Sequence, residues 1–373
     1  MNVVIIGCGA VGAAIAYELS LVKGLNITVF DKQPPAQAAT GSALGVLMGI
    51  ISHKIKGKAW QLRQISIQRY ESLIPELEEL TNSKIPFNRQ GIVMLLMKNA
   101  DASVSDEEIS RWEKLTKIRH TQGYQLEIWD TAKLQNFCPQ VEDKNIITAV
   151  YSPQDRQLDP TALTLALVTA AQKNGVTFKF GVNVLGITPS VSRQEGHFCQ
   201  QLETTEGKIA ADWFVIAAGL GSSPLAAQLN YSVDIRPVLG QALQLRLGYS
   251  LGNPDFQPVI TGNDVHIVPV GNGNYWVGAT VEFPTNGNHE ITPDLELLES
   301  VKQQAIALCP DLAKATTIRT WSGLRPRPQA RPAPIIEKLS GFSNVLLATG
   351  HYRNGILLAP ATADAIREMI ISN

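Results

Sequence analysis

The sequence predicts an α/β protein with two interleaved domains, one built on a parallel sheet and the other, an α+β domain, on a mostly antiparallel sheet. Two observations favour this fold class. Apolar runs that end in glycine alternate with helical patterns in three separate parts of the chain, and the segments between them carry short strands divided by glycine and asparagine turns. A length of 373 residues is sufficient for about two domains.

The start of the chain predicts a dinucleotide-binding site. An apolar run, residues 3–6, leads into a Gly-x-Gly-x-x-Gly motif, and a second apolar run ends in an acid about twenty residues further on. Such a series places a pyrophosphate on the free amides of a helix N-terminus and a ribose on the acid. The motif by itself fits NAD as well as FAD. The residues expected to contact the dinucleotide are Gly7, Gly9, Ala10, Val11, Gly12, Asp31 and Lys32.

Three later segments are expected to reach the same ligand. The loop after Asp31 contains the small residues Ser42, Ala43 and Gly45, which let backbone and hydroxyl groups approach a cofactor, although the loop also suits a plain surface connection. Two further buried strands, 213–218 and 345–348, lead into glycines, the first directly and the second after Thr349. Because ligands bind at the carboxyl edge of a parallel sheet, these strand ends are predicted to contribute Ala218, Gly219 and Gly350.

The pattern changes divide the chain into two sets of segments. Residues 1–84, 146–237 and 326–373 carry the strand and helix alternation and form the predicted nucleotide-binding domain. Residues 85–145 and 238–325 contain the short strands and charged helices, and form the predicted substrate-binding domain.

Composition and charge exclude several classes of protein. A formal net charge of -1 with no run of like charges argues against a nucleic-acid partner. The four cysteines are far apart and the histidines have no paired ligand spacing, so neither a disulfide framework nor a metal site is expected. No apolar run approaches the ~20 residues that span a bilayer, and the first strand leaves no room for a signal peptide. We therefore expect a cytoplasmic protein, and leave a homo-oligomer open.

Five short motifs, taken together, resemble a known family. They are residues 7–12 with Asp31, residues 216–221, "YWVGATVEF" at 275–283, "WSGLRPRP" at 321–328 and "GHYRNGILLAPAT" at 350–362. In this order they resemble the D-amino acid oxidase-like FAD-dependent oxidoreductases, and within that family the glycine oxidase branch. The resemblance covers nearly the whole chain. It implies noncovalently bound FAD in a Rossmann-type domain, and oxidation of an amine next to a carboxylate.

The resemblance also implies roles for individual residues. Arg325 matches the arginine that pairs with the substrate carboxylate, and a guanidinium offers a carboxylate a planar, charge-assisted fork. Val184 is similar to the residue at the adenine, and Ser42 with Gly45 to the loop nearest the flavin ring. His266 stands where glycine oxidase has a tyrosine, and Leu239 where the family often has a basic residue. The loop expected to face the flavin contains Gly350, Tyr352, Arg353, Asn354, Gly355 and Ile356.

The expected reaction follows from these roles. Arg325, Arg353 and His266 form the predicted catalytic set, which orients a small amino acid, such as glycine, sarcosine or a small D-amino acid, for oxidation to the imino acid. Dioxygen then becomes hydrogen peroxide. Three alternatives remain open at this stage: a dehydrogenase that passes electrons to a quinone or carrier, a non-catalytic FAD-binding protein, and an NAD-linked dehydrogenase.

Overall fold

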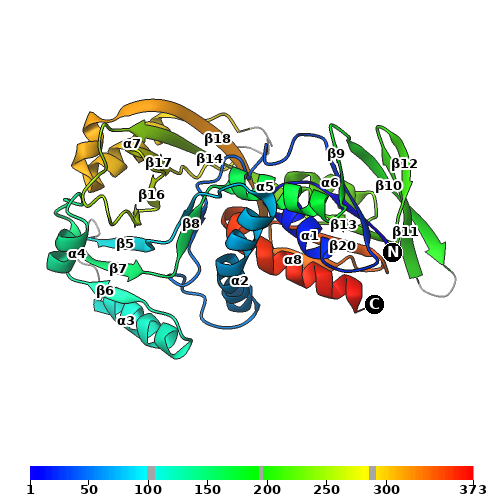
Figure 1. Cartoon of the computed structure of the whole chain (residues 1–373), viewed down its shortest axis with the longest axis horizontal. Coiled ribbons are helices and arrows are strands. Elements are labelled where there is room, and N and C mark those ends of the chain that lie inside the picture. The colour runs from blue at the N-terminus through cyan, green and yellow to red at the C-terminus, as the bar shows by residue number, and fades with distance from the viewer. Residues whose placement is uncertain (99–105, 193–195, 285–290, 373) are drawn as a thin grey trace.

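The apolar run at the start of the chain forms β1 (Asn2–Ile6), an inner strand of a six-stranded sheet (Figure 1). The computed structural model describes residues 1–98, 106–192, 196–284 and 291–372. Strands pair in parallel across this sheet except at its end, where the last strand runs antiparallel. The strand order is β19 (Ile335–Lys338), β20 (Val345–Thr349), β13 (Trp213–Ile216), β1, β2 (Asn26–Asp31) and β9 (Thr177–Phe180).

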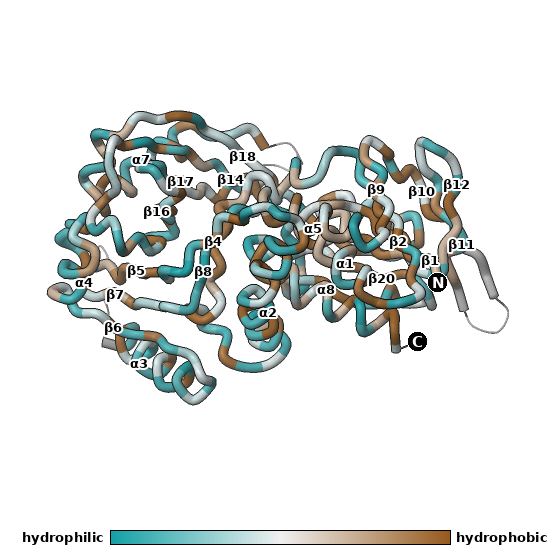
Figure 2. The backbone as a smooth tube through the Cα atoms, viewed as in Figure 1, coloured by the Kyte–Doolittle hydropathy of each residue, from teal (hydrophilic) through white to brown (hydrophobic). Residues whose placement is uncertain are grey.

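Helices cover this sheet and bury their apolar residues against it and against one another. Helix α1 (Ala10–Ser20) is buried along almost its whole length and packs against α5 (Pro160–Lys173) and α8 (Gly355–Ile371). Helix α2 (Lys58–Thr81) packs against α8 and α5 and buries one apolar face. The fully buried strand β20 stands out as hydrophobic in Figure 2, whereas α3 (Asp106–Thr121), at the edge of the molecule, is mostly hydrophilic.

A second large sheet has eight strands and is mixed. Strands β15 and β5 pair in parallel, and the other neighbouring strands pair antiparallel. Short helices α4 (Thr131–Phe137) and α7 (Leu295–Leu308) pack against it. The strand order is β18 (Thr316–Pro328), β14 (Ile235–Arg246), β17 (Asn274–Gly278), β16 (Val265–Pro269), β15 (Val259–Gly262), β5 (Ile92–Met97), β7 (Ile146–Ser152) and β6 (Glu127–Trp129).

Two strands of this sheet lie at domain boundaries that the sequence predicts. Strand β7 pairs with β5 and β6, so the sequence boundary at residue 146 falls directly before a strand of the eight-stranded sheet. Prolines are rare inside a sheet, but β18 crosses the boundary at residue 325 and continues through Pro326 and Pro328. Because β18 is the last strand of its sheet, a missing amide there breaks no ladder on its free side.

The described residues also form two three-stranded sheets. Strands β10 (Val184–Ser192), β11 (Gly196–Thr204) and β12 (Gly207–Ala210) form an antiparallel sheet at one end of the molecule in Figure 1. Strands β3 (Val46–Leu47), β8 (Arg156–Leu158) and β4 (Phe87–Asn88) join the segments between the two large sheets. The α/β fold class predicted from the sequence is confirmed, but the second large sheet, predicted as mostly antiparallel, is mixed because β15 and β5 pair in parallel.

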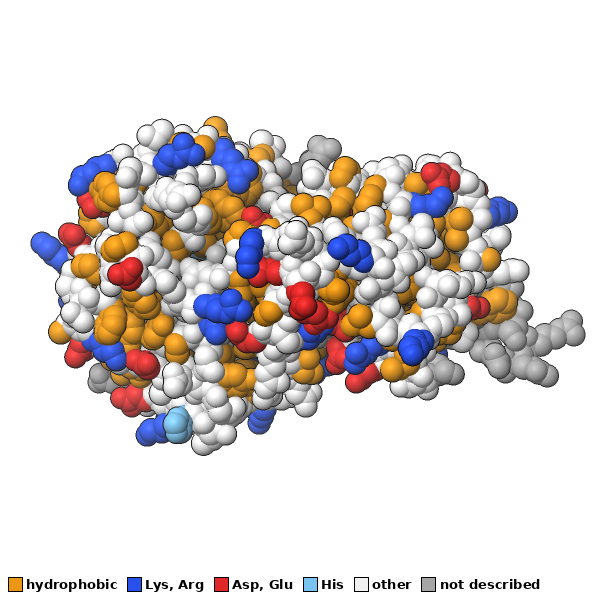
Figure 3. All heavy atoms as spheres, viewed as in Figure 1, with side chains coloured by type: hydrophobic (Ala, Val, Ile, Leu, Met, Phe, Trp, Pro, Cys, Tyr) orange, Lys and Arg blue, Asp and Glu red, His pale blue; other side chains and the backbone are white. Residues whose placement is uncertain are grey.

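Figure 3 shows basic and acidic side chains interspersed over one face of the molecule, as a net charge of -1 suggests. Within the described ranges, every helix is too short or too polar to cross a membrane.

Candidate active site

The glycine-rich turn between β1 and α1 places the backbone against the ends of two strands. Gly7 has a φ of +103°, which favours glycine, and a Cβ there would lie 2.5 Å from the carbonyl oxygen of Ala217 after β13. A Cβ at Gly12 would lie 2.0 Å from the oxygen of Gly7. Close approach of α1 to the turn therefore requires both glycines, and it leaves Gly9 as the helix N-cap.

Asp31 stands at the end of β2 and holds this turn. Its carboxylate accepts a hydrogen bond from the Cys8 amide at 2.7 Å and another from the Gln33 amide at 2.9 Å. The sequence predicted Asp31 as a ribose ligand, and the structure adds a second task. The same carboxylate fixes the glycine-rich turn and the start of the following loop.

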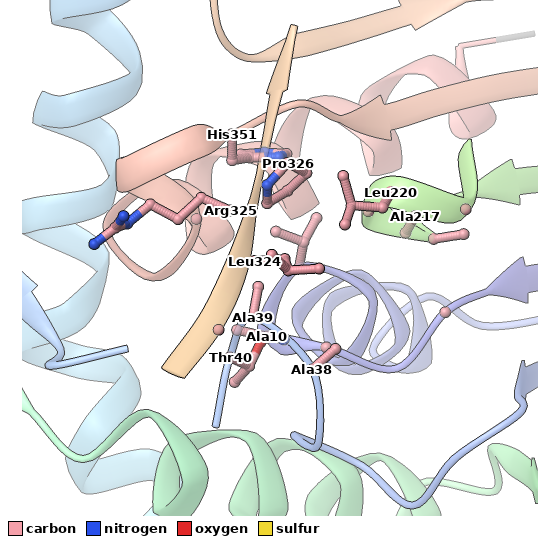
Figure 4. Close-up of a pocket in the computed structure, with 18 of the residues that line it drawn as sticks. Ala10, Ala38, Ala39, Thr40, Ala217, Leu220, Leu324, Arg325, Pro326 and His351 are labelled. Carbon is pink, nitrogen blue, oxygen red and sulfur yellow. Dashed lines mark hydrogen bonds between the residues drawn. The ribbon is translucent and has the colours of Figure 1, made fainter. Parts of the chain in front are cut away.

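The loop after Asp31 returns to α1, as one of the two sequence readings expected. Thr40 accepts a hydrogen bond from the amide of Ala10 at 3.0 Å through its hydroxyl, and the two residues are neighbours in Figure 4. Ser42 donates to the carbonyl of Ser322 on β18 at 2.9 Å. The loop therefore connects the first helix with the eight-stranded sheet.

A cavity of about 810 Å³ extends along these segments. In Figure 4 the Arg325 side chain extends to one side of β18, while Ala217 and Leu220 lie on the opposite side of that strand. The predicted site residues that line the cavity are Gly7, Gly9, Ala10, Val11, Asp31, Lys32, Ser42, Ala43, Gly45, Val184, Ala218, Gly219, His266, Arg325, Gly350, Tyr352, Arg353, Gly355 and Ile356.

Two predicted residues do not line the cavity. Gly12 lies under the turn, where it permits the close packing described above. Asn354 is the N-cap of α8, and its amide donates to the carbonyl of His351 at 3.0 Å. Both shape the site through the backbone and do not face the cavity themselves.

Arg325 is held by backbone carbonyls. Its Nη1 donates to the oxygen of Leu239 at 3.1 Å and to the oxygen of Thr280 at 3.0 Å, and the guanidinium lies over Gly240, where a Cβ would be 2.2 Å from Nη2. Within the described residues Arg325 forms no ion pair, and Nε and Nη2 make no further hydrogen bond. This half-buried cation therefore has donors available to an anionic ligand.

A buried hydrogen-bond network includes Thr280, whose carbonyl accepts from Arg325. The Glu282 carboxylate accepts hydrogen bonds from the Gln241 amide side chain at 2.9 Å, from the Asp294 backbone amide at 2.9 Å and from the Thr280 hydroxyl. Burial lowers the pKa of Arg325, as does the charge of Arg353, whereas Glu282 raises it. An arginine remains charged through such shifts, so the site presents a fixed cation.

His266 faces the cavity from β16 as a neutral imidazole. Its pKa is lowered to about 4, chiefly by burial and also by the charge of Arg353, while the charge of Asp264 opposes the shift. Its Nδ1 lies 2.8 Å from the hydroxyl of Thr261 on the neighbouring strand. A neutral ring at neutral pH can both donate and accept a hydrogen bond.

His351 has a defined tautomer. The Thr362 hydroxyl donates its hydrogen to the carbonyl of Leu358 at 2.7 Å, so it accepts a hydrogen bond from Nε2 of His351 at 2.9 Å. The ring nitrogen Nδ1 is therefore an acceptor. Burial lowers the pKa of His351 to about 4, and the residue lines the cavity.

Among the lining residues that the sequence did not predict, Asp264 is the one that carries a negative charge beside the predicted arginines. Asp264 lies at the tip of the hairpin between β15 and β16, and its Oδ1 is 3.5 Å from Nη1 of Arg353. The Asn-Asp pair signals a tight hairpin turn in the sequence. Nothing local shows that the tip meets the loop before α8, because 89 residues separate Asp264 from Arg353.

The fold and the cavity define an α/β protein in which a glycine-rich strand-to-helix turn and the guanidinium of Arg325 line the same cavity. The model of the family described as "FAD dependent oxidoreductase" matches residues 2–369. The chain belongs to this family, whose cofactor is FAD. The site fits such a group, because a Cβ at Gly9 would come within 3.1 Å of the Thr40 hydroxyl where α1 begins, and glycine keeps this helix N-terminus open to phosphate.

Curated relatives support the family assignment. The bifunctional protein ThiO/ThiG of Synechocystis sp. is 32% identical over 375 residues, covering 99% of this chain and 51% of the relative. The chain thus spans about half the length of that protein. The glycine oxidase of Geobacillus kaustophilus is 27% identical over 371 residues, covering 99% of this chain and 92% of the relative.

Solved structures share the fold. The crystal structure of glycine oxidase from Geobacillus kaustophilus has a TM-score of 0.86 at 26% identity, covering 100% of this chain and 94% of that one. The L-proline dehydrogenase of P. horikoshii has a TM-score of 0.84 at 20% identity, and is similar in fold alone.

Proposed function

We propose that the protein oxidises the amine of glycine, of a small amino acid or of an N-methyl glycine to the imino acid, which then hydrolyses to a 2-oxo acid and ammonia or an amine. Dioxygen is the proposed electron acceptor and hydrogen peroxide the second product. The observation that carries the proposal is Arg325, a half-buried cation that lines the cavity and forms no ion pair within the described residues.

The cofactor-binding part of the proposal rests on the strand ends. The start of α1, with Gly9, Ala10 and Val11, would hold the pyrophosphate, while Asp31 and Lys32 would face the adenosine and Val184 the adenine. The loop before α8 and the start of that helix would face the flavin, which would remain noncovalently bound. Bound FAD supplies the two-electron acceptor that receives hydrogen from the α carbon and reduces dioxygen.

The chain's own residues bind and orient the substrate. Arg325 offers Nε and Nη2 to the carboxylate, and its contacts with two carbonyls fix the plane of the guanidinium. His266 is neutral, so it adds no second charge for the carboxylate and offers a hydrogen bond to a polar group of the substrate. Positioning of this kind needs no acid-base triad, because a substrate with a neutral amine is already in the reactive form.

Anaerobic mixing tests the proposal directly. The purified FAD-loaded protein is mixed with glycine, sarcosine, D-alanine or D-proline while the flavin absorbance is followed, and we expect bleaching with at least one of them. Absence of bleaching with all four would overturn the substrate class. Oxygen consumption with and without an artificial acceptor then separates an oxidase from a dehydrogenase.

A variant of Arg325 tests the carboxylate site. Arg325→Ala removes a charge-assisted hydrogen bond that contributes about 1.5 to 3 kcal/mol, so KM for the amino acid should rise about 10- to 150-fold. Arg319→Ala on the same strand is the matched control, because Arg319 is exposed and packs on Trp321 outside the cavity. An unchanged KM in Arg325→Ala would remove Arg325 from the carboxylate role.

A further inference from the structure

The tip of the hairpin between β15 and β16 places the exposed carboxylate of Asp264 at the edge of the cavity. The last residue pair of this ladder is Gly262 with Val265, so Asn263 and Asp264 form a two-residue turn. Both have left-handed backbones, with φ of 50° and 63°, as a tight hairpin turn requires. The turn geometry fixes where Asp264 stands, and Asp264 lines the cavity.

Asp264 belongs to a cluster of charged groups at the Arg325 end of the cavity. Its carboxylate is 3.5 Å from Arg353, which precedes α8. The charge of Arg353 in turn lowers the pKa of Arg325 and of His266, while Asp264 raises that of His266. The four groups come from β15–β16, β18 and the loop before α8, and all of them line the cavity.

The charges of this cluster favour a ligand with one carboxylate. Arg325 and Arg353 contribute two positive charges, Asp264 one negative charge, and His266 none because it is neutral. The Glu282 carboxylate does not line the cavity and accepts hydrogen bonds from Gln241 and Asp294. The remaining single positive charge matches the monoanion of an amino acid with a neutral amine and an uncharged side chain.

We propose that Asp264 is a specificity-determining residue that occupies Arg353 and thereby makes the site selective for monocarboxylic over dicarboxylic amino acids. The inference rests on the proposed function, because it takes Arg325 as the site of the first carboxylate. A second carboxylate needs Arg353, and Asp264 competes for it. Removing the negative charge of Asp264 leaves two unpaired arginines, which together match a dianion.

The variant Asp264→Asn tests this assignment without disturbing the turn, because asparagine adopts the left-handed conformation readily. The FAD-loaded wild type and variant are titrated with acetate and with malonate, and the flavin absorbance reports binding without any turnover. We expect the affinity for malonate relative to acetate to rise about two- to fivefold in the variant, the range for an exposed ion pair. The ratio of kcat/KM for iminodiacetate to that for sarcosine should rise in parallel.

Two controls separate this effect from a general loss of charge. Asp234→Asn removes an exposed partner of Arg236, 2.8 Å away, at a place outside the cavity, and should leave both ratios unchanged. Adding Arg353→Gln to Asp264→Asn should return the malonate-to-acetate ratio toward the wild-type value. An unchanged ratio in Asp264→Asn, with acetate still bound, would overturn the inference alone. Absence of acetate binding in the wild type would overturn the proposed carboxylate site and this inference with it.

Discussion

Replacing Gly240 by alanine tests how Arg325 is held. The guanidinium lies directly over this residue of β14, and an added Cβ would be 2.2 Å from Nη2, 2.3 Å from Nη1 and 2.4 Å from Cζ. Ordinary van der Waals contacts begin near 3.4 Å, so the guanidinium must move by roughly 1 Å. A shift of that size breaks the hydrogen bonds of 3.1 and 3.0 Å to the carbonyls of Leu239 and Thr280.

The expected result is a loss of carboxylate affinity in a folded protein. The Cβ meets the end of a flexible side chain and not the backbone, so the melting temperature should change little. If the displaced arginine no longer pairs with the ligand, acetate affinity falls by the contribution of a charged hydrogen bond, about 1.5 to 3 kcal/mol, or about 10- to 150-fold. The assay is titration of flavin absorbance with acetate, together with KM for the best substrate.

Gly248→Ala is the matched control for this variant. Gly248 lies just beyond the end of the same strand and has nothing within 4 Å of an added Cβ, so its replacement should leave acetate affinity unchanged. An acetate affinity of Gly240→Ala within about twofold of the wild type, in protein that retains FAD, would refute the reasoning that the position of Arg325 over β14 sets carboxylate binding.

Two further predictions concern the backbone and the pH dependence. Gly12→Ala should lower the free energy of unfolding by about 1 to 3 kcal/mol or more and weaken FAD retention, measured by urea unfolding and by flavin release, because its Cβ would lie 2.0 Å from the Gly7 carbonyl oxygen. Equal stability of that variant would contradict the close packing of α1. Burial lowers the pKa of His351 from its ordinary 6.5 to about 4, so its contribution to stability is present above 6.5 and is lost as the pH falls toward 4. The urea concentration at the unfolding midpoint should therefore decrease as the pH falls from 6.5 to 4, and His351→Gln should weaken this decrease. Part of the decrease should remain, because the pKa of His266 is also lowered to about 4.

The nucleotide-binding half of the site was predictable because its signals are local. The turn at Gly7, Gly9 and Gly12 and the acid at Asp31 lie within one strand-helix-strand unit, and parallel strands bring their carboxyl ends to one edge. The structure confirms that edge by placing β13 beside β1 and β20 beside β13.

The substrate-side geometry was less predictable because its contacts join distant segments. The prolines near Arg325 suit a turn, and only the position of β18 at the sheet edge explains why the strand continues. In the sequence, Asp264 is typical of a hairpin turn and Gly240 is a glycine within a strand. Only the tertiary structure shows that Asp264 lies beside Arg353 and that Arg325 lies over Gly240. Each of these facts depends on the tertiary arrangement of two strands or loops.

The way Arg325 is held has a consequence for ligand binding. Two carbonyl oxygens satisfy part of the guanidinium, but carbonyls carry no net charge, so they fix its orientation without neutralising it. A carboxylate at the same distance would neutralise the arginine and would have to be displaced by the substrate at the cost of a buried charge. In the proposed role of Arg325, carbonyls leave the positive charge for the ligand. Glu282 holds the two segments that supply these carbonyls, because it pairs with the Leu239 backbone and accepts a hydrogen bond from the Thr280 hydroxyl. The site is thereby preorganised for an anion before the anion arrives, which reduces the reorganisation that binding would otherwise require.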